Sequence, residues 1–139
     1  IGECAGEVVA SIDFDLMASE REVFQAQDRF DSDDVEGAAE IAYRAMVLSA
    51  KALVKTQDAS IRDDAALVMA EFRTRFYDSE VFFDPFVGAK FARYYLRAHD
   101  ETLNGEAVTP DLAHRRIGEA QLFVEAAHAC YGRMGRETV

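Results

Sequence analysis

The sequence predicts an all-α domain, folded as an antiparallel bundle of about five helices. Half of the 139 residues are hydrophobic, which is enough to bury a core. Only two prolines and eight glycines interrupt the chain. Alanine is abundant and strand-favouring runs are scarce, while apolar residues recur at helical spacing. A chain of this length commonly forms one domain, so we expect residues 1–139 to be a single domain.

Charge and cysteine content exclude several classes of protein. The net charge is −11, which disfavours binding to a phosphate backbone, so no nucleic-acid partner is expected. Cys4 and Cys130 lie at opposite ends of the chain and form no metal-binding pair. No apolar run approaches the ~20 residues of a membrane span, and we expect no signal peptide. We expect a cytoplasmic protein with no membrane partner and no cofactor in this segment.

The first ten residues are expected to form a linker. The chain starts at Ile1 without an initiator methionine, and Gly2, Cys4 and Gly6 give its opening a loop-like composition. Residues 1–10 would then connect an upstream domain of a longer protein to the first helix.

The first helix is predicted over residues 11–30. Ser19 and Glu22 stand at the spacing of a capping box, which would split this segment in two, although one continuous helix is preferred. The residues that recur at helical spacing are Ile12, Leu16, Val23, Ala26, Gln27 and Phe30.

The second helix is predicted over residues 33–55. Asp33 and Glu36 have the spacing of a capping box, and their carboxylates suit the positive end of a helix dipole. Small side chains on its apolar stripe permit close approach of a neighbouring helix. The stripe consists of Ala38, Ile41, Ala42, Ala45, Ser49, Ala52 and Leu53.

Start signals define the rest of the bundle. Ser60, with Asp63 three residues later, starts the third helix, while Asp84 and Thr109 are each followed by a proline, as at an N-cap. Gly105 ends the fourth helix. The last three helices are therefore predicted over residues 61–77, 85–102 and 110–133.

A metal site is not predicted. A carboxylate-bridged di-iron bundle needs Glu-x-x-His pairs on two facing helices. Glu125 with His128 matches one pair, and Asp111 with His114 is a looser match, but both lie on the same predicted helix. We interpret these four residues as surface polar side chains.

Arg93 and His99 are the candidate catalytic residues. An arginine and a histidine close in space can hold a phosphodiester and move a proton. Six positions along a helix leave two side chains roughly 120° apart, so the two would not converge on an unbroken helix. The favoured interpretation is an arginine that flanks the core and a histidine on the surface.

Aromatic residues are concentrated between positions 72 and 95, which hold nine of the fifteen in the chain. They form either the core and the cover of one bundle end, or a surface for a partner, because aromatics are enriched at interfaces. The candidate interface residues are Phe82, Phe83, Phe86 and Tyr94.

Residues 33–40 (DDVEGAAE), with Tyr43 and residues 51–53 (KAL) after them, resemble the second helix of HEPN-type bundles. The resemblance implies an HEPN-like helical bundle that forms a homodimer. The ribonuclease signature of this family is an arginine, four to six residues and a histidine. Arg93 and His99 fit that spacing, although aromatic residues follow Arg93 where catalytic members usually have a polar residue.

Residues 1–9 (IGECAGEVV), 71–78 (EFRTRFYD) and 82–86 (FFDPF) are similar to the C-terminal extension of some bacterial ferredoxin-type nitrite/sulfite reductases. Such reductases hold sirohaem and a 4Fe-4S cluster through cysteines in their catalytic part. This sequence has no matching cysteine group, so the resemblance implies a cofactor in the parent chain and none in this segment.

The leading hypothesis is a non-catalytic helical accessory domain, C-terminal to a nitrite/sulfite reductase. It would mediate self-association as a homodimer, or docking of a protein partner or of the upstream reductase domain. The alternative is a metal-free HEPN-type ribonuclease that uses Arg93 and His99.

Overall fold

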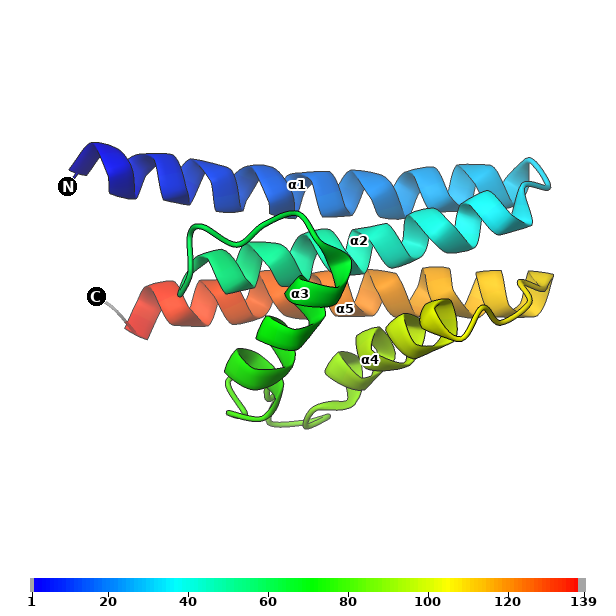
Figure 1. The fold of residues 1–139 in the computed structure, drawn as a ribbon. Helices are drawn as coiled ribbons and strands as arrows, with labels where there is room; N and C mark the ends of the chain where they lie inside the picture. The colour runs from blue at the N-terminus through cyan, green and yellow to red at the C-terminus, as the bar shows by residue number, and fades with distance from the viewer. Residues whose placement is uncertain (1, 138–139) are drawn as a thin grey trace.

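The protein is an all-α bundle of five helices, as the sequence predicts (Figure 1). The computed structural model describes residues 2–137, with the surroundings of side chains for residues 6–134, and this part contains no β-strand. The helices are α1 (Gly2–Asp31), α2 (Val35–Lys55), α3 (Ala65–Phe72), α4 (Lys90–Leu103) and α5 (Pro110–Glu137). A π-helical turn, η1 (Arg73–Tyr77), continues α3.

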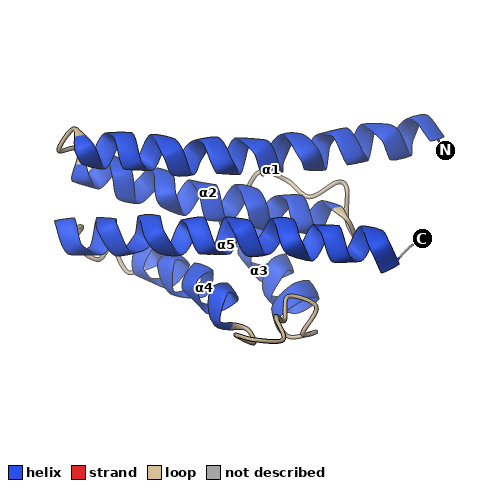
Figure 2. Ribbon diagram, turned by 180° about the vertical axis from the view of Figure 1, so that it is seen from behind, coloured by secondary structure: helices blue, strands red, loops and turns tan. Residues whose placement is uncertain are grey.

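The three long helices α1, α2 and α5 lie side by side, and α1 runs antiparallel to the other two (Figure 1). The view from behind shows the same layer with α3 and α4 along one side (Figure 2). α2 is the central element, because it packs against each of the other four helices. The start of α1 and the end of α5 consequently lie at the same end of the bundle.

The central position of α2 follows from its small side chains. Ala38, Ala42, Ala45 and Ala50 are fully buried, and such residues let neighbouring helices approach closely. A helix that is apolar on most of its circumference is stable only when it is surrounded. The alanine-rich stripe predicted from the sequence therefore forms the centre of the bundle.

Five aromatic rings form a cluster within the core. Phe72, Phe76, Phe82, Tyr95 and Phe123 come from four different segments, and their contacting ring centroids lie 5.0 to 5.8 Å apart. Phe82 is only 5% exposed. Its assignment as an interface residue is therefore wrong: its ring packs on those of Phe72 and Phe123 and belongs to the core.

α1 begins at Gly2, so the expected linker over residues 1–10 is helical from its second residue. Val8 packs against Ile12 and Leu16, which extends the apolar stripe by one more step of four residues. The helix is also continuous through Ser19, whose buried hydroxyl donates to the Leu16 carbonyl at 2.6 Å and caps nothing.

Asp34, and not Asp33, caps α2. The Asp34 carboxylate accepts hydrogen bonds from the Gly37 amide and from Arg29 Nη1, each at 3.0 Å. The hydrogen bond from Gly37, and after it that from Arg29, lowers the pKa of Asp34. Asp33 has a φ of 66°, the left-handed conformation of the preceding turn. A Cβ at Gly37 would lie 2.2 Å from an Asp34 oxygen, so this cap requires the glycine.

α4 starts at Lys90, five residues later than predicted, because Asp84 closes a tight loop in place of a helix. The Oδ1 atom of Asp84 accepts hydrogen bonds from the backbone amides of Phe86 and Val87 at 2.7 and 3.2 Å. Asp84 and Gly88 also exchange both backbone hydrogen bonds, and Gly88 adopts a φ of +62°. The loop leaves Phe86 on the surface, with 93% of its area exposed.

The limits of α3 and α5 also differ from the prediction. Asp64, not Ser60, caps α3, accepting from two backbone amides at 3.0 and 3.1 Å, so this helix starts at Ala65. Thr109 caps α5 as predicted, with its hydroxyl oxygen accepting from the Leu112 amide at 3.1 Å. α5 then continues to Glu137, four residues beyond its predicted end.

Replacement of Phe72 by alanine should lower the free energy of unfolding by about 3–5 kcal/mol, since it leaves a cavity among four other rings. Urea unfolding followed by circular dichroism measures the change. The matched control is Phe86→Ala, because that ring is almost wholly exposed and its loss should cost less than about 0.5 kcal/mol. Equal effects of the two changes would contradict the aromatic core.

Candidate functional site

The structure does not bring Arg93 and His99 together. α4 is an unbroken helix, so the two side chains point in directions roughly 120° apart. Arg93 is exposed and lines a surface hollow with Phe83 and Val87. His99 is only 8% exposed, so its assignment to the surface is wrong. Its burial follows from Ala92, Tyr95 and Ala98, which make the same face of α4 part of the core.

A tyrosine–histidine pair, half-buried at Tyr43, joins α2 to α4. The Tyr43 hydroxyl lies 2.6 Å from His99 Nδ1. Burial lowers the pKa of His99, nearby Arg73 lowers it further, and Asp100 opposes both. Burial also raises the pKa of Tyr43 to about 12, against the effect of Arg116. At neutral pH the histidine is therefore uncharged and the tyrosine keeps its proton, so a hydrogen bond between two neutral groups links the two helices.

Arginines on α4 and α5 are neutralised by carboxylates. The Glu101 carboxylate accepts hydrogen bonds from Arg115 at 2.5 Å and from Arg116 at 3.1 Å. Burial acts to raise the pKa of Glu101, but the hydrogen bonds from these two arginines outweigh it and the pKa is lowered. Glu119 pairs with Arg115 and with Arg97. This charge network fixes α4 on α5 and leaves these guanidinium groups occupied by protein carboxylates.

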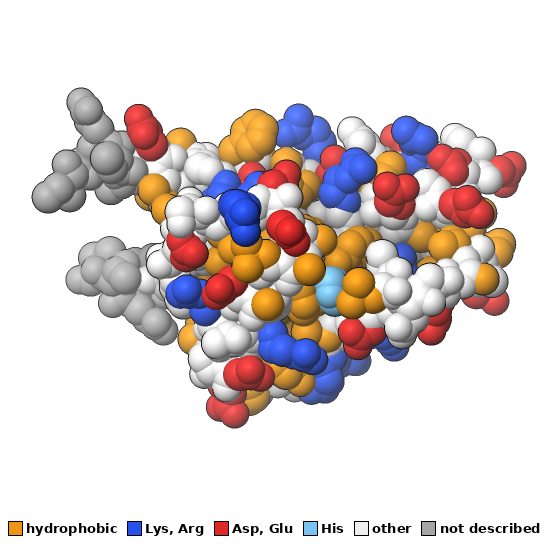
Figure 3. All heavy atoms as spheres, viewed as in Figure 1, with side chains coloured by type: hydrophobic (Ala, Val, Ile, Leu, Met, Phe, Trp, Pro, Cys, Tyr) orange, Lys and Arg blue, Asp and Glu red, His pale blue; other side chains and the backbone are white. Residues whose placement is uncertain are grey.

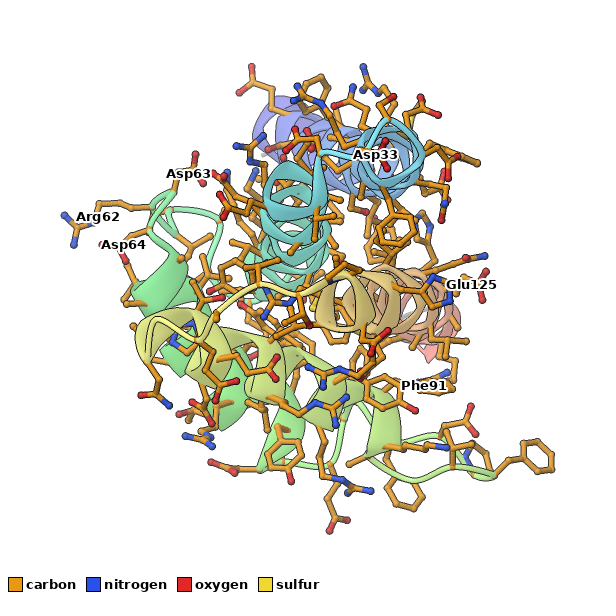
Figure 4. The ribbon with its side chains drawn as sticks, turned by 90° about the vertical axis from the view of Figure 1, so that its right-hand side faces the viewer. Asp33, Arg62, Asp63, Asp64, Phe91 and Glu125 are labelled. Carbon is orange, nitrogen blue, oxygen red and sulfur yellow. The ribbon has the colours of Figure 1, made fainter. Side chains whose placement is uncertain are left out.

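The residues weighed as metal ligands lie apart. His128 Nε2 is 3.1 Å from a carboxylate oxygen of Glu20 on α1. Glu125 projects from the outer side of α5 (Figure 4). Within residues 6–134, no group of three or more histidine, cysteine or acidic side chains is placed to hold a metal ion.

Two of the four predicted interface residues are well exposed. Phe83 and Phe86 lie on the loop before α4 with half or more of their side chains in solvent. Tyr94 is half-buried, because its ring packs against Phe91 at 5.8 Å and under the Arg97 guanidinium at 5.8 Å. The loop surface is therefore smaller than the sequence suggests.

A second exposed apolar surface lies on α1, and the sequence analysis missed it. Phe14, Met17 and Phe24 are 65%, 63% and 75% exposed. They belong to a row of exposed residues spaced alternately by four and three positions, which we call the outer seam. The outer seam consists of Ala10, Phe14, Met17, Arg21, Phe24 and Asp28.

The opposite face of α1 carries the same spacing, shifted by two residues. We call this row the inner seam; its members are buried or half-buried against the bundle. The inner seam consists of Ile12, Leu16, Ser19, Val23, Ala26 and Phe30. A shift of two residues turns the helix by about 200°, so α1 is apolar on two opposite sides. In Figure 3 a large hydrophobic side chain stands out along the edge formed by α1.

A buried ion pair fixes the rotation of α1 that exposes the outer seam. Lys55 Nζ of α2 lies 2.5 Å from the Asp15 carboxylate and 2.6 Å from the Ser11 hydroxyl. The Lys55 and Asp15 side chains are 11% and 7% exposed. Turning α1 about its axis would leave both charges buried without a partner, which is costly.

A groove between α1 and α5 continues from the outer seam. It has a volume of ≈430 Å³, and Val23, Phe24, Ile117 and Val124 give it an apolar lining. Glu125 stands at its rim on α5 (Figure 4). Because Phe24 belongs to both features, the groove and the outer seam form one apolar surface.

The outer seam is detectable in the sequence, because it repeats at four- and three-residue intervals through three large apolar residues. One stripe alone predicts the helix. The sequence signal of a second exposed apolar face is therefore two interleaved stripes on one helix.

The chain matches no protein-family model, and the comparison with curated proteins gives no significant match. Within the described residues, no helix is both long and apolar enough to cross a membrane. The fold and its surfaces define a class, a helical bundle with exposed apolar side chains on its first helix.

Burial of His99 predicts a loss of stability in acid. Its pKa is lowered in the folded state, so the unfolded chain binds a proton more readily below the unfolded pKa of 6.5. The free energy of unfolding should therefore be retained above that pH, and fall as the pH drops below 6.5 and through the lowered pKa of the folded state. Urea unfolding at several pH values measures this slope.

His99→Asn should flatten the slope, because asparagine can accept the Tyr43 hydroxyl and does not titrate. The matched control is His114→Asn, which removes an exposed histidine and should preserve the slope. A slope that survives in the His99 variant would contradict the assignment.

Proposed function

We propose that this chain is a non-catalytic accessory domain whose role is self-association of its parent protein. The observation that carries the proposal is the outer seam of α1. Single exposed apolar residues are ordinary on soluble proteins, but a contiguous patch rimmed by polar residues marks an interaction site. Phe14, Met17 and Phe24 are exposed along one face of a long helix whose other face is anchored in the core.

The chemistry of the histidine and the arginines supports a non-catalytic role over the ribonuclease alternative. His99 is hydrogen-bonded to Tyr43, and Arg93 points about 120° away from it on α4. Arg115 and Arg116 are engaged by Glu101. A phosphodiester would have to displace these carboxylates and approach a chain of net charge −11, which is electrostatically unfavourable.

We also propose that the parent chain is a cytoplasmic nitrite/sulfite reductase with sirohaem and a 4Fe-4S cluster upstream of this domain. The support is the resemblance of residues 1–9, 71–78 and 82–86 to the C-terminal extension of such enzymes. Phe83 and Phe86 offer a separate surface for contact with the upstream domain. The reading frame preceding residue 1 should then encode paired cysteine motifs, one of them Cys-x-x-x-Cys.

Self-association predicts that the full chain has twice the mass of one copy at high concentration. Light scattering coupled to size-exclusion chromatography, over a wide range of concentrations, measures the mass. It should fall towards that of one chain on dilution, because burial of the apolar patch drives the association. One-copy mass at every concentration would contradict the proposal.

A further inference from the structure

We infer that the outer seam of α1 packs antiparallel against the same seam of a second copy, about a two-fold axis that crosses this face between Met17 and Arg21, at the level of Ser19 along the helix. The inference rests on the proposed self-association and adds the surface, the direction and the register. Alternating steps of four and three residues are the pattern by which two helices interlock along a common seam. All six residues of the outer seam are exposed, so the seam is open to a second helix.

The order of residues along the seam fits an antiparallel pair. With the axis at the level of Ser19, Phe14 of one copy faces Phe24 of the other, and each pair of rings occurs twice by symmetry. Met17 then faces the aliphatic stem of Arg21, and Ala10 faces Asp28. Large side chains meet at the middle of the seam, and small or polar ones lie at its ends, as expected for an interface with an apolar centre and a polar rim.

Charge selects this direction over the parallel one. A parallel pair would place Arg21 against Arg21 and Asp28 against Asp28, and like charges in contact destabilise an interface. In the antiparallel pair, Arg21 of one copy lies beside Glu20 and Asp13 of the other. Two arginines thereby separate the two Glu20 carboxylates that meet near the axis.

Arg21 has no carboxylate within reach on its own helix face. The residues three and four positions away, where a helical ion pair would form, carry no charge. These residues are Met17, Ala18, Phe24 and Gln25. Its charge is consequently free to pair with a carboxylate of the second copy.

The groove between α1 and α5 gives the partner's aromatic ring a place to bind. In the antiparallel register, Phe14 of the second copy lies over Phe24, between Glu20 and Gln27. Together with Val23, these three residues form the α1 side of the groove. Each copy therefore offers its groove to Phe14 of the other copy, which enlarges the contact area on both sides of the two-fold axis.

Cross-linking tests the direction and register. Ala10→Cys and Asp28→Cys are made singly in a Cys4→Ser background that keeps the buried Cys130. A mixture of the two variants, treated with a short bismaleimide, should give a covalent dimer on a denaturing gel. Each variant alone should give none, because residue 10 faces residue 28 and not itself. Self-cross-linking of each single variant would indicate a parallel pair and overturn the inference.

Paired variants test the surface. Phe14→Ser with Phe24→Ser should reduce the mass in light scattering to that of one copy. Because both rings are exposed, thermal unfolding of this variant should match that of the wild type at a concentration where the wild type is also one copy. The matched control, Phe83→Ser with Phe86→Ser, removes two exposed rings from the loop and should leave the dimer intact. A dimer lost only in the loop variant would overturn the inference while preserving self-association, whereas a monomeric wild type would overturn both.

Reversal of charge tests the ionic contact. Arg21→Glu should weaken the dimer by about tenfold or more in dissociation constant, since it leaves only carboxylates near the axis. Addition of Glu20→Arg in the same chain exchanges the two charges and should restore much of the affinity, although Asp13 of the other copy still lies beside residue 21. Failure of the exchange to restore it would contradict the proposed register.

Discussion

The rest of the structure depends on the burial of α2 on nearly all sides. Its alanines let α1, α3, α4 and α5 pack closely on one helix, and no larger side chain would leave room for all four. The aromatic cluster around Phe72 fills the space that small residues leave between α2, α4 and α5. Polar links such as Tyr43 with His99 then set the rotation of the outer helices.

This arrangement explains why α1 has a free apolar face. α1 covers the side of α2 that faces away from α3 and α4, and it is held there by the inner seam and by the pair of Lys55 with Asp15. No other helix of the described part reaches its far side. The outer seam therefore remains in solvent as a consequence of the topology, and the proposed second copy would cover it.

The fold could be predicted from the sequence because helix periodicity and capping residues are local signals. The predicted helix boundaries were wrong where two local structures compete. Asp33 and Asp34 are both possible caps of α2, and Asp84 can either start a helix or close a loop with Gly88. The candidate site was harder to predict, because burial depends on contacts distant in sequence. Nothing local distinguishes Phe82 in the core from Phe86 in solvent, or reveals that His99 meets Tyr43.

Distances between spin labels on two copies test the central claim, that α1 pairs antiparallel with α1, most directly. Labels on Gln25→Cys and Asp31→Cys, each in a Cys4→Ser background, should be separated along the helix axis by about 18 Å and about 36 Å. The separation should grow as the label moves away from Ser19, because the copies run in opposite directions. Equal separations at both positions, or no distance between copies, would contradict the account.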